Sequence, residues 1–226
     1  MGTLFENTKY PLTIWFKVIY RLCQSKKGMS ALQIHRMIGS ESYRTAWSMC
    51  HRVRAAMTTE AGPQLVGQVE VDETYVGGKE RNKPKAKRSP LNGTAGKIPV
   101  IGALARQGFV VAKVISTPDT PTWQGFVTAP VSLHADLVVT DEHPGYRHLA
   151  GSEYRPETGR HGAAEYVRGP VHTQTIESFW SLLKRGIMGA FHHVSQHYLP
   201  FYLNEFTFRH NYRTDPHLFE RVLIAG

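Results

Sequence analysis

Residues 69–75 read Val-Glu-Val-Asp-Glu-Thr-Tyr, a stretch in which valines and acidic residues alternate as far as Asp72. This alternation predicts a β-strand over residues 66–75, which a Gly-Gly pair terminates. A carboxylate inside a buried strand is costly unless a cation or a hydrogen-bond donor compensates it. Successive side chains point to opposite faces of a strand, so Asp72 and Glu73 cannot both face one site, and we expect Asp72 to do so. The alternative is that Glu70, Asp72 and Glu73 line the solvated face of an edge strand.

A second acid closes another apolar segment. Residues 137–141 read Leu-Val-Val-Thr-Asp, which predicts a short, fully apolar strand that ends at Asp141. Glu142 follows, and here too we expect the aspartate to face the site. Two carboxylates on strands that could be neighbours predict a site for a divalent metal. Asp and Glu oxygens are the ligands that suit Mg²⁺ or Mn²⁺.

A third acid lies on a predicted helix, residues 173–185. The apolar stripe of this helix consists of Ile176, Phe179, Trp180 and Leu183. Lys184 follows Glu177 by two helical turns, so both side chains lie on nearly the same face. A metal-binding carboxylate near a cation suits a phosphodiester held for cleavage. The alternative is an ordinary amphipathic helix with a surface Glu and a surface Lys.

The segments between these acids complete an α/β pattern. We expect strands over residues 98–105 and 109–116, joined in a hairpin at Arg106, Gln107 and Gly108. We also expect a helix over residues 119–133 and a further helical segment over residues 193–212. The order strand, strand, strand, helix, strand and then helices predicts a mixed sheet flanked by helices. An Ala-Gly-Pro sequence at residues 61–63 marks the start of this domain, which we place at residues 61–226.

Residues 1–60 predict a small helical domain. Helical spacing indicates one helix from about residue 12, a second over residues 30–38 with Ser30 as N-cap, and a third over residues 42–57. A short helix, a turn with glycine and a longer basic helix resemble a helix-turn-helix, whose second helix could enter a DNA major groove. Arg44 and Arg52 would then contact DNA. The alternative is a three-helix packing or dimerisation unit.

Charge and composition restrict the partners. The formal net charge is +9, which favours a polyanionic partner, with nucleic acid ahead of an anionic membrane surface. No apolar run approaches the roughly 20 residues that span a bilayer, so we expect a cytoplasmic protein.

The two cysteines, Cys23 and Cys50, form no Cys-x-x-Cys pair and are predicted to be buried apolar residues.

The three acids together form a more specific pattern. Sixty-eight residues separate Asp72 from Asp141, and 35 separate Asp141 from Glu177. This spacing resembles the Asp-Asp-Glu signature of transposases and retroviral integrases. The surrounding sequences Val-Glu-Val-Asp-Glu-Thr-Tyr-Val-Gly-Gly-Lys, Val-Thr-Asp-Glu and Thr-Gln-Thr-Ile-Glu-Ser-Phe-Trp-Ser-Leu-Leu-Lys-Arg-Gly resemble the ISXO-like transposase domain of bacterial insertion sequences. The resemblance spans nearly the whole chain.

That resemblance implies an RNase H-like catalytic domain and a DNA transposase. Asp72, Asp141 and Glu177 would hold two Mg²⁺ or Mn²⁺ ions, and the enzyme would cleave transposon ends and join them to target DNA. A homodimer or a higher oligomer on DNA is expected, because two ends must be joined, and the protein would associate with the nucleoid. The alternatives are an RNase H-like nuclease that cuts without joining and an inactive, transposase-derived DNA-binding protein.

Basic residues near the acids are the predicted DNA contacts of the catalytic domain, since Lys and Arg release counterions from phosphates. One group lies between the first two strands and comprises Lys79, Arg81, Lys83, Lys85, Lys87 and Arg88. A second group surrounds the helix of Glu177 and comprises His172, Lys184 and Arg185. The alternative for the first group is a solvated loop without a DNA contact.

Overall fold

The computed structural model describes residues 3–58, 64–78, 84–87, 96–116, 119–140, 156–158 and 173–225. The chain forms two compact units. Unit 1 consists of Met1–Ala61 and Arg185–Gly226, and unit 2 consists of Gly62–Lys184. Unit 2 begins at Gly62, and the sequence analysis places the domain start at residue 61. The C-terminal segment, which the sequence analysis grouped with the catalytic domain, packs with the N-terminal helices, so which functions each unit carries stays a prediction.

Unit 2 contains a five-stranded mixed sheet in the order β3-β2-β1-β4-β5. Central β1 pairs antiparallel with β2 and parallel with β4. The predicted α/β class with a mixed sheet is therefore confirmed. The strands are β1 (Gln68–Val76), β2 (Ile98–Ala105), β3 (Val110–Val114), β4 (Leu137–Thr140) and β5 (Pro156–Thr158). The helices are η2 (Lys85–Lys87), a short 3₁₀ helix, α4 (Thr120–Thr128) and α5 (Gln174–Gly186).

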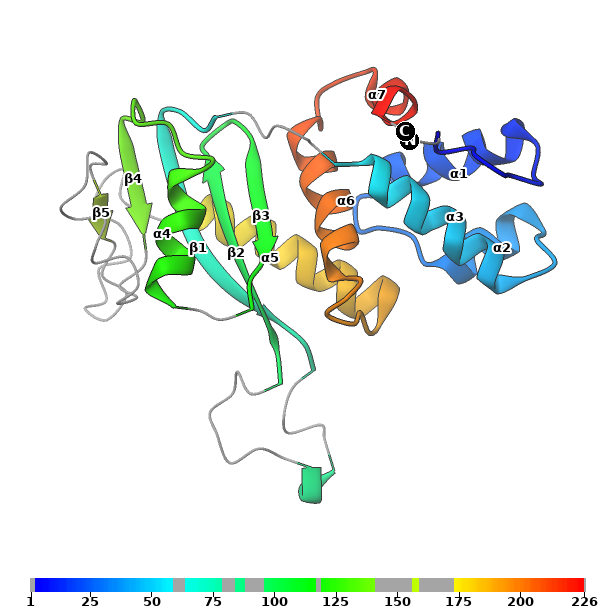
Figure 1. The fold of residues 1–226 in the computed structure, drawn as a ribbon, viewed down its shortest axis with the longest axis horizontal. Coiled ribbons are helices and arrows are strands. Elements are labelled where there is room, and N and C mark those ends of the chain that lie inside the picture. The colour runs from blue at the N-terminus through cyan, green and yellow to red at the C-terminus, as the bar shows by residue number, and fades with distance from the viewer. Residues whose placement is uncertain are drawn as a thin grey trace. The chain divides into compact units, whose positions relative to one another are not determined.

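The two faces of this sheet are covered by different helices (Figure 1). Val69 and Val71 of β1 pack with Trp123 and Phe126 of α4 in the hydrophobic core of unit 2. Because side chains alternate along a strand, Glu70 and Asp72 point to the opposite face, which α5 covers. Hydrogen bonds between these acids and α5 confirm that placement. The alternation in residues 69–72 thus places the two valines on the core face and Glu70 and Asp72 on the face that α5 covers.

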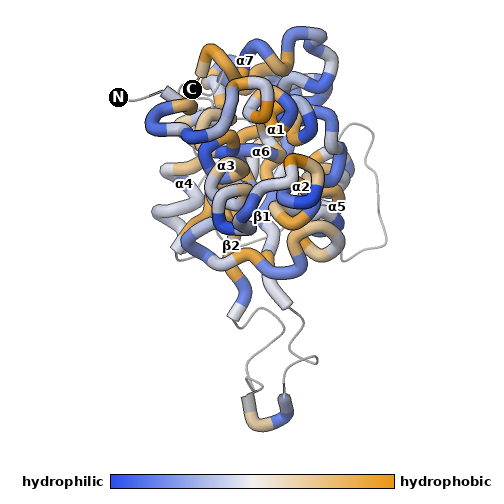
Figure 2. The backbone as a smooth tube through the Cα atoms, turned by 90° about the vertical axis from the view of Figure 1, so that its right-hand side faces the viewer, coloured by the Kyte–Doolittle hydropathy of each residue, from blue (hydrophilic) through white to orange (hydrophobic). Residues whose placement is uncertain are grey.

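Unit 1 is helical. Its elements are α1 (Leu12–Gln24), α2 (Ala31–Ile38), α3 (Tyr43–Ala56), the π-helical turn η5 (Ile187–Phe191), α6 (Leu199–Asn211) and α7 (Leu218–Ala225). Ser30 caps α2 in a capping box with Gln33, as its position predicted. Gly39 ends α2 with a positive φ of 61°, a conformation that glycine adopts at little cost. Hydrophobic and hydrophilic segments alternate along these helices in Figure 2, as expected of helices with one buried face.

Three elements differ from the expectation. The predicted helix over residues 193–212 begins only at Leu199, because Pro200 favours the first turn of a helix. Strand β5 has three residues and pairs with β4, and so short a strand leaves no periodic pattern. Helix α7 lies beyond the last predicted element and places Val222 in the core of unit 1. That core also contains Cys23 and Cys50, and burial raises the pKa of the two thiols to about 12 and about 11.

A buried ionic cluster connects α3 to α6 within unit 1. The guanidinium Nε of Arg54 donates to Glu205 Oε2 at 2.6 Å, and Arg209 donates to Glu205 Oε1. Burial alone would raise the pKa of the Glu205 carboxyl, but Arg209 and Arg54 hold it below its ordinary value. Two arginines therefore share one fully buried carboxylate. This cluster holds α3, which precedes unit 2 in the chain, against α6, which follows it.

His51 lies beside this cluster. Its ring is 4.1 Å from that of Trp47 and 4.9 Å from that of Tyr198, measured between centroids. Neither ring nitrogen has a hydrogen-bond partner within the described part of the chain. Burial and the nearby charge of Arg54 lower the pKa of His51 to about 4, against the opposing effect of Glu205. His51 is thus an uncharged histidine held in an aromatic environment.

We expect His51→Phe to stabilise the protein and to reduce its acid sensitivity. An unfolded histidine titrates near 6.5, so between about pH 6.5 and pH 4 the unfolded chain binds a proton that folded His51 does not. The free energy of unfolding of the wild type should therefore fall as the pH decreases below about 6.5, and His51 should account for a loss of about 2 kcal/mol between pH 7.5 and pH 5. Urea denaturation of both proteins at these two pH values measures the difference. An equal pH dependence in both would contradict the environment described for His51.

Candidate active site

Asp72 lies on the central strand of the sheet. Strand β1 has β2 on one side and β4 on the other, so the alternative of a solvated edge strand is wrong. The half-buried Asp72 carboxylate accepts hydrogen bonds from the Glu73 backbone N–H to Oδ1 at 2.8 Å and from the Trp180 indole Nε1 to Oδ2 at 3.1 Å. These bonds direct the Asp72 carboxylate towards α5.

Strand β4 runs parallel to β1 and carries the second predicted position. Thr140, the last residue of β4, is the register partner of Val71, which directly precedes Asp72. Asp141 follows Thr140 in the sequence and lies outside the described residues. The predicted strand over residues 137–140 is therefore confirmed and is next to the strand of Asp72, whereas the position of the Asp141 carboxylate stays a prediction.

Helix α5 carries the third acid. Glu177 lies in its first turn with an exposed side chain, and the Thr173 hydroxyl donates to Glu177 Oε1 at 3.0 Å. Trp180, the indole donor to Asp72, follows Glu177 by one helical turn. The predicted apolar stripe is confirmed, because Ile176, Phe179, Trp180 and Leu183 are all buried.

Lys184 is close enough to Asp72 for their charges to interact. Loss of water around the amino group lowers the pKa of Lys184, and Lys97 adds to this effect, whereas Asp72 opposes it. The side chain itself is exposed. Helix α5 thus presents a carboxylate and an ammonium group two turns apart, the latter beside a second carboxylate.

A fourth acid, Glu70, holds the N-terminus of α5. Glu70 is 0% exposed, and its Oε2 accepts hydrogen bonds from the backbone N–H groups of Thr175 and Ile176, both at 2.9 Å. The first N–H groups of a helix have no partner within the helix, and the positive end of the helix dipole favours an anion there. The other oxygen, Oε1, accepts from Arg106 Nε at 2.7 Å. Glu70 therefore fixes the start of the helix that carries Glu177.

Sequence reasoning missed this contact. Glu70 and Asp72 are two residues apart and share one face of β1, which was the available signal. Arg106 was expected only as a turn residue between two strands. Its Nη1 also donates to Gln68 Oε1 at 2.6 Å, so the start of the hairpin turn is tied to β1 by side chains. The ion pair of Glu70 with Arg106 depends on the pairing of β1 with β2, and the sequence does not predict which strands are neighbours in the sheet.

We expect Glu70→Gln to loosen the first turn of α5. A neutral amide cannot accept all three of these hydrogen bonds, and it removes the carboxylate from the Arg106 guanidinium, which is 16% exposed. Local opening of α5 should become easier by about 1–3 kcal/mol. Hydrogen–deuterium exchange at Thr175 and Ile176 measures it. In the control Glu73→Gln, on the same strand, exchange at these amides should be unchanged, and wild-type exchange in Glu70→Gln would contradict the capping role.

The predicted DNA-contacting residues have varied surroundings. Arg44 is exposed on α3, whereas half-buried Arg52 donates to the carbonyl oxygens of Glu6 and Leu4 at 2.8 and 3.3 Å. Arg185 is exposed on α5, and Lys85 and Lys87 belong to η2. The remaining predicted contacts, namely Lys79, Arg81, Lys83, Arg88 and His172, lie outside the described residues.

A hollow in unit 1 adds a further basic feature. It has a volume of about 410 Å³ and includes Lys9, Arg44 and Arg52 in its lining, together with hydroxyl side chains of Ser42 and Thr45. It contains no acidic residue among those that line it. Its charge and hydroxyl groups suit an anion such as a phosphate.

The metal-binding potential of unit 2 rests on Asp72 and Glu177. Among the residues that the structure describes, no group of three or more His, Cys, Asp or Glu side chains could hold a metal ion. Asp72 nevertheless fits the chemistry of a divalent cation, since a half-buried carboxylate offers oxygen donors to Mg²⁺ or Mn²⁺. The third ligand of the predicted set, Asp141, falls outside the described ranges.

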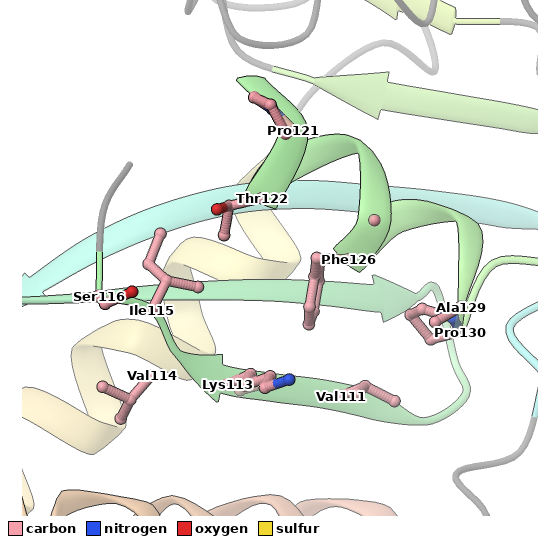
Figure 3. A pocket seen from close by; sticks show the side chains of 12 residues that line it. Val111, Lys113, Val114, Ile115, Ser116, Pro121, Thr122, Phe126, Ala129 and Pro130 are labelled. Atoms are coloured by element: carbon pink, nitrogen blue, oxygen red, sulfur yellow. The ribbon is translucent and has the colours of Figure 1, made fainter. Parts of the chain in front are cut away.

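A cavity of unit 2 is unrelated to this chemistry. It has a volume of about 590 Å³ and lies between α4 and the edge strand β3 (Figure 3). Phe126 points from α4 towards β3, and Lys113 is the one charged residue of the lining. None of the lining residues is acidic, so this cavity offers no carboxylate to a metal. None of the described helices is both long and apolar enough to cross a membrane.

Comparison with known proteins supports the predicted resemblance. Residues 64–211 match the family model of the ISXO2-like transposase domain. Over 219 residues, the chain is 30% identical to an uncharacterised protein in the transposable element ISH50 of Halobacterium salinarum, and the match covers 92% of this chain and 72% of that protein. The predicted family is therefore confirmed.

Solved structures with detectable similarity have low sequence identity. The Mos1 strand transfer complex matches at 12% identity with a TM-score of 0.40, covering 97% of this chain and 79% of that chain. A simian T-cell lymphotropic virus intasome bound to the PP2A regulatory subunit B56 gamma matches at 13% identity with a TM-score of 0.37. That match covers 77% of this chain and 63% of the viral one. Within the chain itself, Asp72 lies on the central strand β1, and the neighbouring strand β4 ends one residue before Asp141.

Proposed function

The chain belongs to the ISXO2-like transposase family, and from this premise we propose that it cleaves DNA at transposon ends and joins those ends to target DNA. The observation that carries the proposal is the placement of Asp72. Its carboxylate lies on the central strand and is hydrogen-bonded to the helix that bears Glu177 and Lys184. Strand β4 ends at Thr140, the register partner of Val71, and the proposed ligand Asp141 is the next residue in the sequence. Asp72 and Glu177, which are far apart in sequence, thus lie on elements that contact each other, and the strand beside β1 ends one residue before Asp141.

Asp72, Asp141 and Glu177 are the proposed ligands of two Mg²⁺ or Mn²⁺ ions. When bound, such ions activate the attacking oxygen and stabilise the leaving oxygen of a phosphodiester. The residues of the chain orient the reacting groups. Glu70 fixes the start of α5 and with it Glu177, the indole of Trp180 holds Asp72, and Lys184 binds a phosphate oxygen.

Two phosphoryl transfers follow from this site. In the first, water attacks the phosphodiester at the transposon end, and the 3′-oxygen leaves and becomes a 3′-hydroxyl. In the second, that hydroxyl attacks a target phosphodiester, and the target 3′-oxygen leaves. No covalent enzyme intermediate is needed, so catalysis depends on positioning and charge stabilisation.

DNA binding draws on basic residues of both units in this proposal. Lys184, Arg185 and the segment that includes Lys85 and Lys87 contact the strand that reacts. In unit 1, the hollow that includes Arg44 and Arg52 supports a contact with backbone phosphates. Joining two ends requires at least two copies of the chain on DNA, and we propose that a homodimer or a higher oligomer assembles at the nucleoid.

A combined cleavage and joining assay tests the function. The donor is an oligonucleotide duplex with the terminal sequence of an element that encodes this chain, and the target is a supercoiled plasmid, with Mn²⁺ or Mg²⁺ present. We expect metal-dependent cleavage of the donor and plasmid molecules that carry it covalently. Cleavage without joining would favour the nuclease, and binding without cleavage would favour the inactive DNA-binding protein; either result overturns the proposal.

A further inference from the structure

Trp180 is a core tryptophan whose indole N–H is hydrogen-bonded to Asp72. It is 3% exposed, and its indole N–H donates to Oδ2 of Asp72 at 3.1 Å. The indole nitrogen of tryptophan is a donor only, and a buried donor needs an acceptor. The apolar stripe of α5 therefore includes one side chain whose polar atom reaches the proposed metal ligand.

Gly102 provides the space for this contact. Gly102 is the register partner of Asp72 on the neighbouring strand β2. A Cβ atom added at Gly102 would lie 2.6 Å from both Cζ2 and Cη2 of Trp180 and 3.4 Å from Cδ1 of Ile176. The indole ring thus occupies the place where the cross-strand neighbour of Asp72 would have its side chain. A residue larger than glycine at this position would displace the ring.

The two donors restrict how the Asp72 carboxylate can rotate. Oδ1 accepts from the Glu73 backbone, and Oδ2 accepts from Trp180 on another element. An ionised carboxylate has about four acceptor sites, so hydrogen bonds to both oxygens are compatible with a metal on the same group. Hydrogen-bond partners of metal ligands fix the ligand geometry, and their loss typically lowers metal affinity 10–100-fold.

We infer that Trp180 is a positioning residue that holds Asp72 in its metal-binding orientation, and that Gly102 is required because the indole fills the space above it. The inference rests on the proposed function, in which Asp72 is a metal ligand. Trp180 acts through Asp72 and touches neither the metal nor the DNA. Its role therefore appears as a change in metal affinity.

Manganese binding to the full chain tests the inference. Free Mn²⁺ is measured by electron paramagnetic resonance during titration of wild type, Trp180→Phe, Gly102→Ala and Asp72→Asn. We expect Trp180→Phe to raise the dissociation constant at least about tenfold, because phenylalanine keeps the apolar contact and lacks the donor. Gly102→Ala, which keeps the donor but displaces it, should act in the same direction. Thermal unfolding without metal shows that each variant is folded.

The matched control is Trp123→Phe. Trp123 is 1% exposed and packs with Val69 and Val71 on the other face of the sheet, so this change costs packing but does not reach Asp72. Trp123→Phe should leave the manganese affinity unchanged. If a general loss of packing were enough to weaken manganese binding, Trp123→Phe would weaken it as well. Wild-type affinity in Trp180→Phe together with weak binding in Asp72→Asn would overturn the positioning role alone. Wild-type affinity in Asp72→Asn would overturn the proposed metal site itself.

Discussion

Replacement of Asp72 by asparagine is expected to reduce DNA cleavage about a thousandfold while the protein remains folded. The amide keeps the size of the side chain and can still accept the Trp180 indole N–H through its oxygen. It removes the negative charge that the proposed divalent cations require. A metal ion contributes several kcal/mol to the stabilisation of transition-state charge, and a loss of about 4 kcal/mol corresponds to about a thousandfold in rate.

The measurement is the rate of donor cleavage under single-turnover conditions with Mg²⁺ and with Mn²⁺. The matched control is Glu73→Gln, one residue further along β1, where the side chain points to the other face of the sheet. The control should cleave within a few-fold of the wild-type rate. Cleavage by Asp72→Asn at a rate close to that of the control would show that Asp72 does not carry the chemistry.

Replacement of Glu205 by glutamine should destabilise unit 1 more than any surface change. Glu205 is 0% exposed and is the shared partner of Arg54 and Arg209. Removing the single anion leaves two buried guanidinium groups without their charge partner, and breaking a buried ion pair in this way costs about 3–5 kcal/mol. For a chain of this length, that loss corresponds to a fall in Tm of about 10 °C. Urea denaturation and thermal melting followed by circular dichroism measure both quantities.

The exposed pair of Glu220 and His217 supplies the control. His217 Nδ1 lies 3.7 Å from Glu220 Oε1, and both side chains are largely exposed to water. An exposed pair contributes little to stability, so Glu220→Gln should change the free energy of unfolding by less than about 1 kcal/mol. If Glu205→Gln were equally mild, the buried cluster would not hold α3 and α6 together.

Glu205 also predicts an acid limit of stability. The arginines hold its pKa below the ordinary value, so its contribution is fully present above the pKa of an unfolded glutamate, about 4.3. The contribution is lost as the pH falls through the lower pKa of the folded state. Glu205→Gln should lack this part of the acid dependence, whereas the share of His51 persists because that histidine titrates at higher pH in the unfolded chain.

Local patterns predicted much of the fold because each depends on near neighbours in sequence. Two such patterns predicted which face of an element is buried. They are the alternation before Asp72 and the apolar stripe of Ile176, Phe179, Trp180 and Leu183. The same patterns contain no information on partners far along the chain. The bonds of Glu70 to α5 span more than 100 residues, and the Arg54–Glu205 pair spans 151.

Only the three-dimensional arrangement reveals such contacts. A glutamate between two valines reads as a strand residue, and nothing in residues 69–71 indicates that its carboxylate caps a helix. Trp180 likewise reads as one member of an apolar stripe, and its indole N–H gains meaning only through the register of Asp72 with Gly102. The residues that would carry the chemistry were thus accessible from the sequence, and the residues that orient them were not.

The most direct test of the central claim is the anomalous scattering of manganese in crystals of the full chain grown or soaked with Mn²⁺. The account predicts a manganese peak between the carboxylates of Asp72 and Asp141, with Glu177 within ligand distance of the same or of a second peak. Carboxylates that lie apart, or a metal bound elsewhere while Asp72 stays without one, would contradict the proposed active site.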